Sequence, residues 1–384
     1  MEIRVLDAAG LDATRDLRSQ GFGALPDGQW AQIIRLAGHT LRGGRQFAGY
    51  EDGRPVATAR IHDLPQWWHG RPVSMGGVGG VVVAPEARGR GVGRRLMTEV
   101  LERCTAFGHA LSVLYPATTP LYRSLGWEHA GSLHRAGLPA EALREVRADA
   151  SVGVRRAGPD DAAEVAEVIR RVHRDAGHCG PIDWGEKAWR IYLADRDVYH
   201  YLAEDGFLAY HWGEGNRSLE VELLVAASEA TLRALWALVG TGSSIVPTVY
   251  ANVAPHDPVF WLTRERTSEE VQRTRWMLRV LDAPAAVEAR GFPPGVSAEA
   301  ALEIDDPQLP ANTGSWRLVV KDGTGRLERG DAAGRPAVRV GARGLAALYG
   351  GVPTSTLRAT GLLEGDAPVL DAVFAAAPFA LDHF

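Results

Sequence analysis

Lysine and cysteine are scarce in this chain. Lysine occurs only at Lys187 and Lys321, so nearly all positive charge comes from arginine, a bias that we attribute to codon composition. The two cysteines, Cys104 and Cys179, stand far apart and give neither a metal-ligand spacing nor a disulfide framework. No metal cofactor is therefore expected.

Long apolar runs and a strong net charge are also absent. No apolar stretch reaches the roughly 18 residues that a membrane-spanning helix needs, and the first residues alternate like a strand instead of forming a signal-peptide core. With a net charge of −5, the chain has no basic field that would recruit nucleic acid. These absences predict a soluble, cytoplasmic protein that binds neither nucleic acid nor a membrane.

The most informative stretch of the chain runs from Val78 to Thr98. Three consecutive valines, Val81 to Val83, predict a buried strand that ends at Pro85, and an amphipathic helix follows the next turn. A helix N-terminus exposes unpaired amide groups and the positive end of the helix dipole, so it binds anions. Glycines in the turn leave the backbone open, and arginines add donors that suit phosphate. The candidate pyrophosphate-binding residues are Arg88, Gly89, Arg90, Gly91, Gly93 and Arg94.

Two other phosphate motifs do not fit this turn. The chain has no Gly-Lys-Ser/Thr, which excludes a P-loop. A dinucleotide fingerprint needs Gly-x-Gly-x-x-Gly, whereas Gly89 to Gly93 reads Gly-x-Gly-x-Gly. The order of strand, Arg-x-x-Gly-x-Gly turn and helix resembles the acetyl-coenzyme A motif of the GNAT N-acetyltransferases. An ordinary glycine-rich turn between a strand and a helix is the alternative interpretation.

A second motif lies around Tyr122. A strand is predicted at 110–115 and a short helix after it, with Gly126 and Trp127 four and five residues beyond the tyrosine. Tyrosine followed by glycine and an aromatic residue is a second GNAT signature. Upstream, helices are expected at 11–20 and 27–42, a hairpin at 47–63, an exposed turn at 67–72 and a strand at 73–83. The glycines of that last strand suggest a bulge or the close approach of another backbone.

The later part of the chain predicts two further units. The run 219–225 resembles the motif strand, but no glycine turn follows it, so 152–280 looks like a degenerate copy of the same fold that walls the substrate pocket. Its first strand is expected at 152–156 and its last at 273–280. Beyond this, strand-like runs at 298–304, 316–320, 327–329 and 338–340 precede helical runs, which predicts a separate α+β domain.

Together these features resemble the Eis-like (enhanced intracellular survival) N-acetyltransferases of actinobacteria. The matching residues are the strand and turn 81–94, Leu121-Tyr122-Arg123, the runs 257–262 and 281–292, and the aromatic C-terminus Phe384. The resemblance implies an α+β protein with an acetyl-CoA-binding GNAT domain at 1–147, a degenerate GNAT domain at 148–283, and a domain like sterol carrier proteins at 284–384.

The resemblance also implies a reaction, its cosubstrate and its residues. Acetyl-CoA would acetylate amines of aminoglycosides or similar polyamines, or lysine side chains, in a homohexamer. Tyr122 would act as general acid and the C-terminal carboxylate of Phe384 as base. The backbone of Val81 and Val83 would bind pantetheine, and that of Leu114 would polarise the thioester. Gly89 stands where family members often carry arginine, which removes one phosphate contact.

Each of these roles has a plainer alternative in the sequence. Tyr122 could simply pack on Trp127, and a chain end such as Phe384 is commonly solvated. Phe22, Asp27 and Trp30 lie where family members line the acceptor pocket, but Trp30 also fits the core face of its own helix. A protein that binds a lipid in its last domain, with the GNAT domains as scaffold, is the alternative function.

Overall fold

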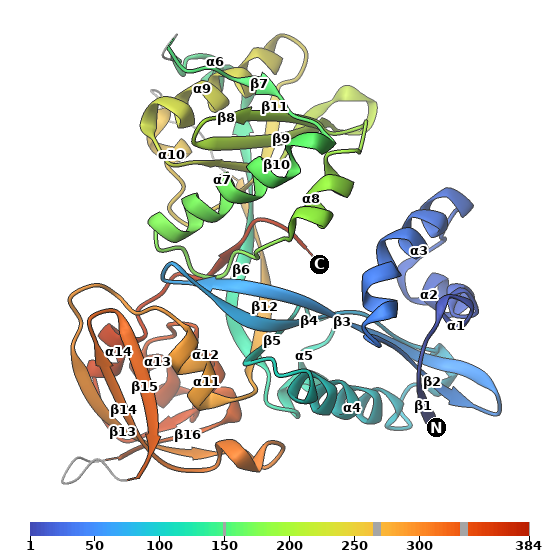
Figure 1. Ribbon diagram of the computed structural model, residues 1–384, viewed down its shortest axis with the longest axis vertical. Coiled ribbons are helices and arrows are strands. Elements are labelled where there is room, and N and C mark those ends of the chain that lie inside the picture. Colours follow the sequence, from blue (N-terminus) through green and yellow to red (C-terminus); the bar gives the residue numbers. More distant parts are fainter. Residues whose placement is uncertain (149–150, 264–269, 331–336, 384) are drawn as a thin grey trace.

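The computed structural model describes residues 1–148, 151–263, 270–330 and 337–383. Figure 1 shows three lobes, which are coloured blue to cyan, green to yellow, and orange to red in sequence order. Among the described residues, a 13-stranded sheet runs through the first two lobes, and a 5-stranded sheet forms the third. This mixture of helices and sheets confirms the α+β prediction. No helix in these ranges combines the length and apolarity of a membrane span.

The first lobe contains the expected strand, turn and helix. A helix predicted at 11–20 is instead two helices, because Thr14 donates its hydroxyl and its N–H to the carbonyl O of Leu11 and closes the first of them. The elements are β1 (Glu2–Val5), α1 (Ala8–Asp12), α2 (Arg15–Phe22), α3 (Asp27–Arg42), β2 (Gln46–Glu51), β3 (Arg54–Trp68), β4 (Arg71–Val83), α4 (Val92–Ala106), β5 (Leu111–Leu114), α5 (Thr119–Arg123), β6 (Glu128–Pro139) and α6 (Ala140–Arg144).

The second lobe repeats this alternation of strands and helices. Its first strand is shorter than the predicted 152–156, and its last strand is longer than the predicted 273–280. The elements are β7 (Arg155–Arg156), α7 (Ala162–Asp175), α8 (Glu186–Tyr192), β8 (Tyr199–Ala203), β9 (Gly206–Trp212), β10 (Ser218–Ala226), α9 (Glu229–Gly240), β11 (Thr248–Val253), α10 (Val259–Leu262) and β12 (Glu270–Val280).

The third lobe has the predicted strands and helices, preceded by one more helix. Its elements are α11 (Ala283–Ala289), β13 (Ala298–Asp305), β14 (Gly314–Lys321), β15 (Thr324–Arg329), β16 (Ala337–Gly341), α12 (Ala342–Tyr349), α13 (Thr354–Ala359), β17 (Leu363–Glu364), α14 (Val369–Val373) and β18 (Phe379–Ala380). The last strand leaves the lobe and pairs with β6 of the large sheet.

The strand β12 joins the first two lobes into one sheet. Although it comes last in the second lobe, it lies between β5 and β6 and runs antiparallel to both. Its register pairs Met277 with Leu114 and Trp276 with Gly131. A strand in this position satisfies backbone hydrogen-bonding groups on one edge of each neighbour. The first two lobes therefore share a continuous sheet.

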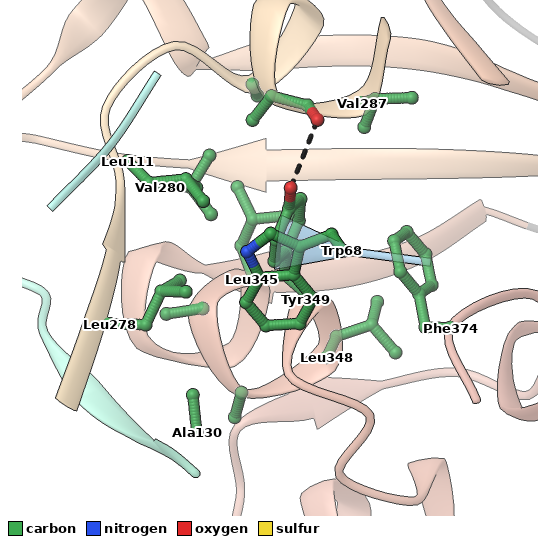
Figure 2. Packing of buried hydrophobic residues seen from close by; sticks show 14 of the residues in the cluster. Trp68, Leu111, Ala130, Leu278, Val280, Val287, Leu345, Leu348, Tyr349 and Phe374 are labelled. Carbon is green, nitrogen blue, oxygen red and sulfur yellow. Dashed lines mark hydrogen bonds between the residues drawn. The ribbon is translucent and has the colours of Figure 1, made fainter. Parts of the chain in front are cut away.

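The third lobe packs against the first through an apolar cluster. Figure 2 shows Trp68 of β3 and Tyr349 of α12 at its centre, with Phe374 nearby. The two central rings lie edge to face with centroids 4.8 Å apart. The prediction of an exposed turn is therefore wrong for Trp67 and Trp68, which are 2% and 0% exposed, and the turn begins at His69. Segments distant in the sequence cover both rings, so the local sequence could not reveal their burial.

Candidate active site

The sheet opens where β4 separates from β5. These two strands are parallel, and their last paired residues are Val78 and Leu114. Beyond this pair β5 ends, while β4 continues to Val83. The end of β4 therefore has an edge that no strand of the described chain covers. The backbone groups along this edge face the gap between β4 and β5.

A β-bulge lies at the point of separation. Gly80 and Val81 of β4 together face the single residue Ala59 of β3. Gly80 has a φ of +61°, a conformation that favours glycine, and its carbonyl O accepts a hydrogen bond from the Thr58 hydroxyl at 2.9 Å. The bulge, one of the two features that the glycines of this strand suggested, is present. Because a bulge bends its strand and increases the twist, it turns the end of β4 away from β5.

The backbone of Val83 faces the opening. The next residue, Ala84, donates its N–H to the carbonyl O of Val56 in β3 at 2.9 Å. Since backbone groups of successive residues in an antiparallel pair point to opposite sides, the N–H and C=O of Val83 point away from β3. Its carbonyl O accepts a hydrogen bond from Nε of Arg88 at 3.2 Å. An extended amide chain could pair with this edge as an added strand does.

The glycine turn leaves the N-terminus of α4 open. Gly91 is the N-cap residue with a φ of +80°, Gly89 has a φ of +73°, and a Cβ at either position would meet nothing within 4 Å. The cap residue provides no side-chain acceptor, so the first amide groups of α4 remain available to an anion. A Cβ on Gly93 would lie 3.5 Å from side-chain atoms of Leu121 and Val83, so this glycine lets α4 approach β4 and α5 closely.

The three arginines of the turn already have partners within the chain. Arg90 forms an ion pair with Glu51 at 2.9 Å, and Nη1 of Arg94 donates to the hydroxyl of Ser124 at 3.2 Å. Arg88 bonds to the backbone as described above. Exposed pairs of this kind contribute about 0–1 kcal/mol. A bound phosphate could therefore take over these side chains at small cost.

Tyr122 combines a buried ring with an available hydroxyl. Its side chain is 5% exposed on α5 and lies edge to face with Trp127, with ring centroids 6.5 Å apart. The hydroxyl makes no hydrogen bond to any residue in the described ranges. Burial raises the pKa of this phenol, which keeps it protonated at neutral pH. The packing interpretation is correct for the ring, while the hydroxyl is free to donate a proton.

The C-terminal segment returns to the large sheet from the third lobe. Figure 1 shows this red segment running along β6 toward α8. Its strand β18 pairs in parallel with β6, so that Phe379 faces Ser132 and Ala380 faces Leu133. Phe384, the predicted base, lies outside the described residues.

Side chains of both lobes hold the segment in place. The Tyr115 hydroxyl donates to the carbonyl O of Asp382 at 2.9 Å, and Nδ2 of Asn252 donates to that of Leu381 at 2.8 Å. The His383 ring lies 4.2 Å from the Tyr115 ring. Because Tyr115 directly follows the last residue of β5, the described chain ends beside the opening between β4 and β5.

Comparison with known proteins identifies the family. Models of a GNAT acetyltransferase domain match residues 2–130 and 180–280, and a sterol carrier protein domain matches residues 283–380. The crystal structure of a GCN5-related N-acetyltransferase from Kribbella flavida is 45% identical, covers 100% of this chain and 98% of its own, and superposes with a TM-score of 0.95. The chain belongs to the GCN5-related N-acetyltransferases.

Curated relatives narrow the assignment within this GNAT family. An uncharacterized N-acetyltransferase of Streptomyces griseus is 29% identical over 328 residues, which are 74% of this chain and 76% of that protein. The N-acetyltransferase Eis of Mycobacterium tuberculosis is 29% identical over 278 residues, 67% of this chain and 66% of that protein. The Eis-like assignment, the fold of two GNAT domains with a sterol-carrier domain, and acyltransferase activity are confirmed.

GNAT acetyltransferases use acetyl-CoA, and the residues of this chain fit it. The uncovered edge of β4 suits the amide groups of an extended pantetheine arm, and the open N-terminus of α4 suits phosphates. Within the described ranges, no three His, Cys, Asp or Glu side chains gather in a metal-binding arrangement.

A cavity of about 290 Å³ lies where the C-terminal segment meets the second GNAT domain. Its acidic side chains are already engaged, since Glu220 pairs with Arg135, and Glu222 accepts a hydrogen bond from the Tyr192 hydroxyl. No motif marks these residues in the sequence. The pairing of β6, β9, β10, β11 and β12, together with the C-terminal segment, brings them to one place. The lining residues are Leu133, Arg135, His211, Glu220, Val221, Glu222, Asn252, Gln272, Thr274 and His383.

The three predicted acceptor residues lie in different surroundings. Phe22 is 60% exposed at the end of α2, and Asp27 is exposed and pairs with Arg15 at 2.6 Å. Trp30 is buried on α3 in a small core, and its indole N–H donates to Asp12 at 2.7 Å. The core interpretation that the sequence left open thus describes Trp30, while the other two remain accessible to a ligand.

Asp382 lies in the C-terminal segment beside Tyr115 and carries a buried carboxyl group. One oxygen accepts a hydrogen bond from the indole N–H of Trp184, and Oδ1 has no hydrogen-bond partner in the described chain. Burial raises the pKa of this carboxyl from its ordinary 3.8 to about 6, although the Trp184 hydrogen bond opposes the shift. The folded protein therefore binds this proton more tightly than the unfolded chain does.

Replacing Asp382 with asparagine is expected to stabilise the protein above pH 6 and to change little below pH 4. In the wild type, the stability linked to this proton is fully present below the ordinary pKa and is lost as the pH rises through about 6. A shift of about two pKa units corresponds to about 3 kcal/mol. Thermal unfolding between pH 4 and 8 would show a Tm difference that grows with pH.

The control for this prediction is Asp322→Asn. Asp322 lies in an exposed turn with a φ of +51°, which asparagine also tolerates. Its Tm difference from the wild type should stay constant with pH. A constant difference for Asp382→Asn as well would contradict the prediction.

Proposed function

We propose that this enzyme transfers the acetyl group of acetyl-CoA directly to an amine, with Tyr122 as general acid and the C-terminal carboxylate of Phe384 as base. The opening between β4 and β5 is the observation that carries this proposal. Leu114 packs in the cluster beneath α4, whereas Tyr115, the next residue, contacts the C-terminal segment. The opening thus has the N-terminus of α4, which suits the coenzyme phosphates, on one side. The C-terminal segment, which leads toward Phe384, lies on the other side.

The proposed coenzyme contacts follow the edge of the opening. Acetyl-CoA supplies an activated acyl group and leaves as a thiol. Backbone groups of Val81 and Val83 would pair with its pantetheine arm, and the backbone of Leu114 would polarise the thioester. The glycine turn would hold the pyrophosphate through Arg88, Gly89, Arg90, Gly91, Gly93 and Arg94. The open N-terminus of α4 supports this assignment.

Each proton of the reaction has a proposed carrier. The free Tyr122 hydroxyl would protonate the departing sulfur as the C–S bond breaks and the C–N bond forms. The Phe384 carboxylate would accept the proton that the amine nitrogen loses. A terminal carboxylate with a pKa of about 3.3–3.7 is a weak base. It becomes effective only if the bound acceptor excludes water from it, or if a water molecule relays the proton.

The acceptor is proposed from the resemblance to Eis-like enzymes. Aminoglycosides or similar polyamines come first, with protein lysine side chains as the alternative, and Phe22, Asp27 and Trp30 as contributors to the pocket. The exposure of Phe22 and Asp27 supports their part in this. A homohexamer and domains at 1–147, 148–283 and 284–384 are proposed on the same basis.

Release of free thiol from acetyl-CoA tests the function directly. We expect release that depends on an acceptor, with a panel of aminoglycosides, simple amines and lysine peptides. A variant extended beyond Phe384 should lose this activity while it keeps its affinity for acetyl-CoA, since the extension removes the α-carboxylate. A folded wild type that releases no thiol with any acceptor would instead favour the ligand-binding alternative.

Replacing Gly91 with valine is expected to raise the KM for acetyl-CoA about tenfold. The side chain would stand over the amide groups at the start of α4, and a φ of +80° costs a branched residue about 1–2 kcal/mol. Steady-state kinetics with varied acetyl-CoA would measure the change. Gly108, after the other end of α4, also has a positive φ of +76° with open space around it, so Gly108→Val is the matched control. Equal KM values for the two variants would refute the phosphate site.

A further inference from the structure

Two arginines, Arg18 and Arg60, border the opening on the face of the sheet opposite α4. Ile61 of β3 packs in the cluster beneath α4, so its neighbour Arg60 points to the other face. Arg60 pairs across the strands with Gly79. A Cβ on Gly80 would lie 2.9 Å from Nη1 of Arg18 and 3.6 Å from Cγ of Arg60. Both side chains therefore lie at the bulge where β4 turns away from β5.

Neither arginine has an acidic partner in the described chain. Arg18 is 4% exposed and donates to two neutral groups, Oγ1 of Thr14 at 3.2 Å and Oε1 of Gln46 at 3.3 Å. Arg60 is partly buried, and its Nε meets no acceptor among the described residues. A guanidinium group removed from water without a counter-charge is unfavourable, because its lost hydration is not replaced.

Helix α2 packs against β3 and β4 near the two arginines, and α1 precedes it. A carboxylate on each of these helices accepts a hydrogen bond from another residue. Asp12 at the end of α1 accepts a hydrogen bond from the indole of Trp30 at 2.7 Å. Asp16 on α2 accepts one from Nε2 of Gln20 at 3.0 Å. Neither carboxylate forms an ion pair with the two arginines, so Asp12 and Asp16 do not compensate the positive charge at the bulge.

The surroundings favour an anion over a cation. Burial lowers the pKa of Arg18 to about 10, and repulsion from Arg60 adds to this effect. His62 lies on the same face of β3 and is neutral at physiological pH, because burial, the charge of Arg60 and His39 lower its pKa to about 3. A cationic group placed here would face two like charges, whereas an anion would relieve their repulsion.

We propose that Arg18 and Arg60 bind an anionic group of the acceptor, so that the preferred substrate is an amine carrying a carboxylate or a phosphate. The planar donor fork of arginine matches both groups. This proposal rests on the proposed acetyl transfer. It replaces the polyamine acceptors, which were proposed only from the resemblance to Eis-like enzymes, with amines that also carry an anionic group. An anion at the bulge would place an amine a few bonds away in the opening between β4 and β5.

Matched acceptors and variants test the proposal. Phenylalanine and phenylalaninamide share ring and amine but differ in the carboxylate, and O-phosphoethanolamine with ethanolamine forms the phosphate pair. Arg60→Gln removes the charge, Arg60→Lys retains it, and Arg54→Gln is a control at the exposed start of the same strand. The ratio of kcat/KM within each pair is compared between proteins, so that differences in amine basicity cancel.

We expect Arg60→Gln to lower kcat/KM about 10- to 100-fold for the acceptors of one anionic class, the size of a lost charge-assisted contact. The uncharged partner should change less than twofold, Arg60→Lys should recover part of the loss, and Arg54→Gln should match the wild type. An equal loss for charged and uncharged acceptors, or a wild-type preference for aminoglycosides over both anionic classes, would overturn the proposal.

A binding measurement tests the anion site independently of the acetyl transfer on which the proposal rests. Calorimetry with N-acetylphenylalanine and N-acetyl-O-phosphoethanolamine, in the presence of coenzyme A, needs no turnover. Binding that Arg60→Gln weakens, in a protein that acetylates nothing, would support the anion site and refute the reaction. Absence of binding to the wild type by both compounds would refute the anion site even if uncharged amines are acetylated.

Discussion

Replacing Tyr122 with phenylalanine is expected to lower kcat about 10²- to 10³-fold, with little change in the KM for acetyl-CoA. Phenylalanine keeps the buried ring and its contact with Trp127 but removes the hydroxyl that has no partner in the described chain. Proton transfer by a positioned acid typically contributes about 10²- to 10⁴-fold to a rate. Because the departing thiolate is a better leaving group than an alkoxide, we place the effect in the lower part of that range. Acceptor-dependent thiol release at saturating acetyl-CoA would measure it.

The matched control is Tyr349→Phe. Tyr349 is also buried, but its hydroxyl donates to the carbonyl O of Ala286 at 3.2 Å in the third lobe, away from the opening. This variant should lose about 1 kcal/mol of stability and keep the wild-type kcat. The pH dependence adds a second readout, since burial raises the pKa of Tyr122 and any loss of rate from its ionisation should occur only in alkaline solution. A Tyr122→Phe enzyme with wild-type kcat would show that the tyrosine only packs.

Replacing Asp306 with alanine is expected to destabilise the protein by about 3–5 kcal/mol. Its carboxylate pairs with Arg279 of β12 at 2.6 Å, and both side chains are 0% exposed. Nε of Arg279 also donates to the carbonyl O of Leu125 at 3.1 Å, so the pair ties the third lobe to the large sheet. Removal of the carboxylate leaves a buried guanidinium without its counter-charge. Urea unfolding at pH 7, followed by fluorescence and circular dichroism, would report the loss.

An exposed ion pair provides the comparison for Asp306. Glu303, near the end of β13, pairs with Arg339 at 2.8 Å, and the two side chains are 47% and 67% exposed. Glu303→Ala should change the free energy of unfolding by no more than about 0.5 kcal/mol, because water and salt screen this pair. If both alanine variants lose similar free energy of unfolding, burial of the pair between Asp306 and Arg279 does not determine its contribution to stability. Non-coincident unfolding curves for Asp306→Ala would indicate that the third lobe separates first.

Patterns within a few residues predicted the strand, turn and helix that border the proposed coenzyme side of the opening. The valines before Pro85, the glycines after it and the amphipathic run beyond determine a strand, a left-handed turn and a helix, because each depends on local backbone preferences and hydrogen bonds. The glycines of β4 likewise indicated the bulge at Gly80. Residues without a local signal were missed or misjudged, such as Trp68, Tyr115 and Asn252.

The sequence by itself determined the family, the order of the three domains, and the strand, turn and helix that start at Val81, since these depend on short-range spacing. Only the tertiary structure decided that β12 lies between β5 and β6 and that the C-terminal segment lies against Tyr115. It also decided that Arg18 and Arg60 lie together with no acidic partner among the described residues. These features depend on contacts between segments far apart in the chain. Whether a side chain is buried, paired or left with an uncompensated charge is set by its neighbours in space.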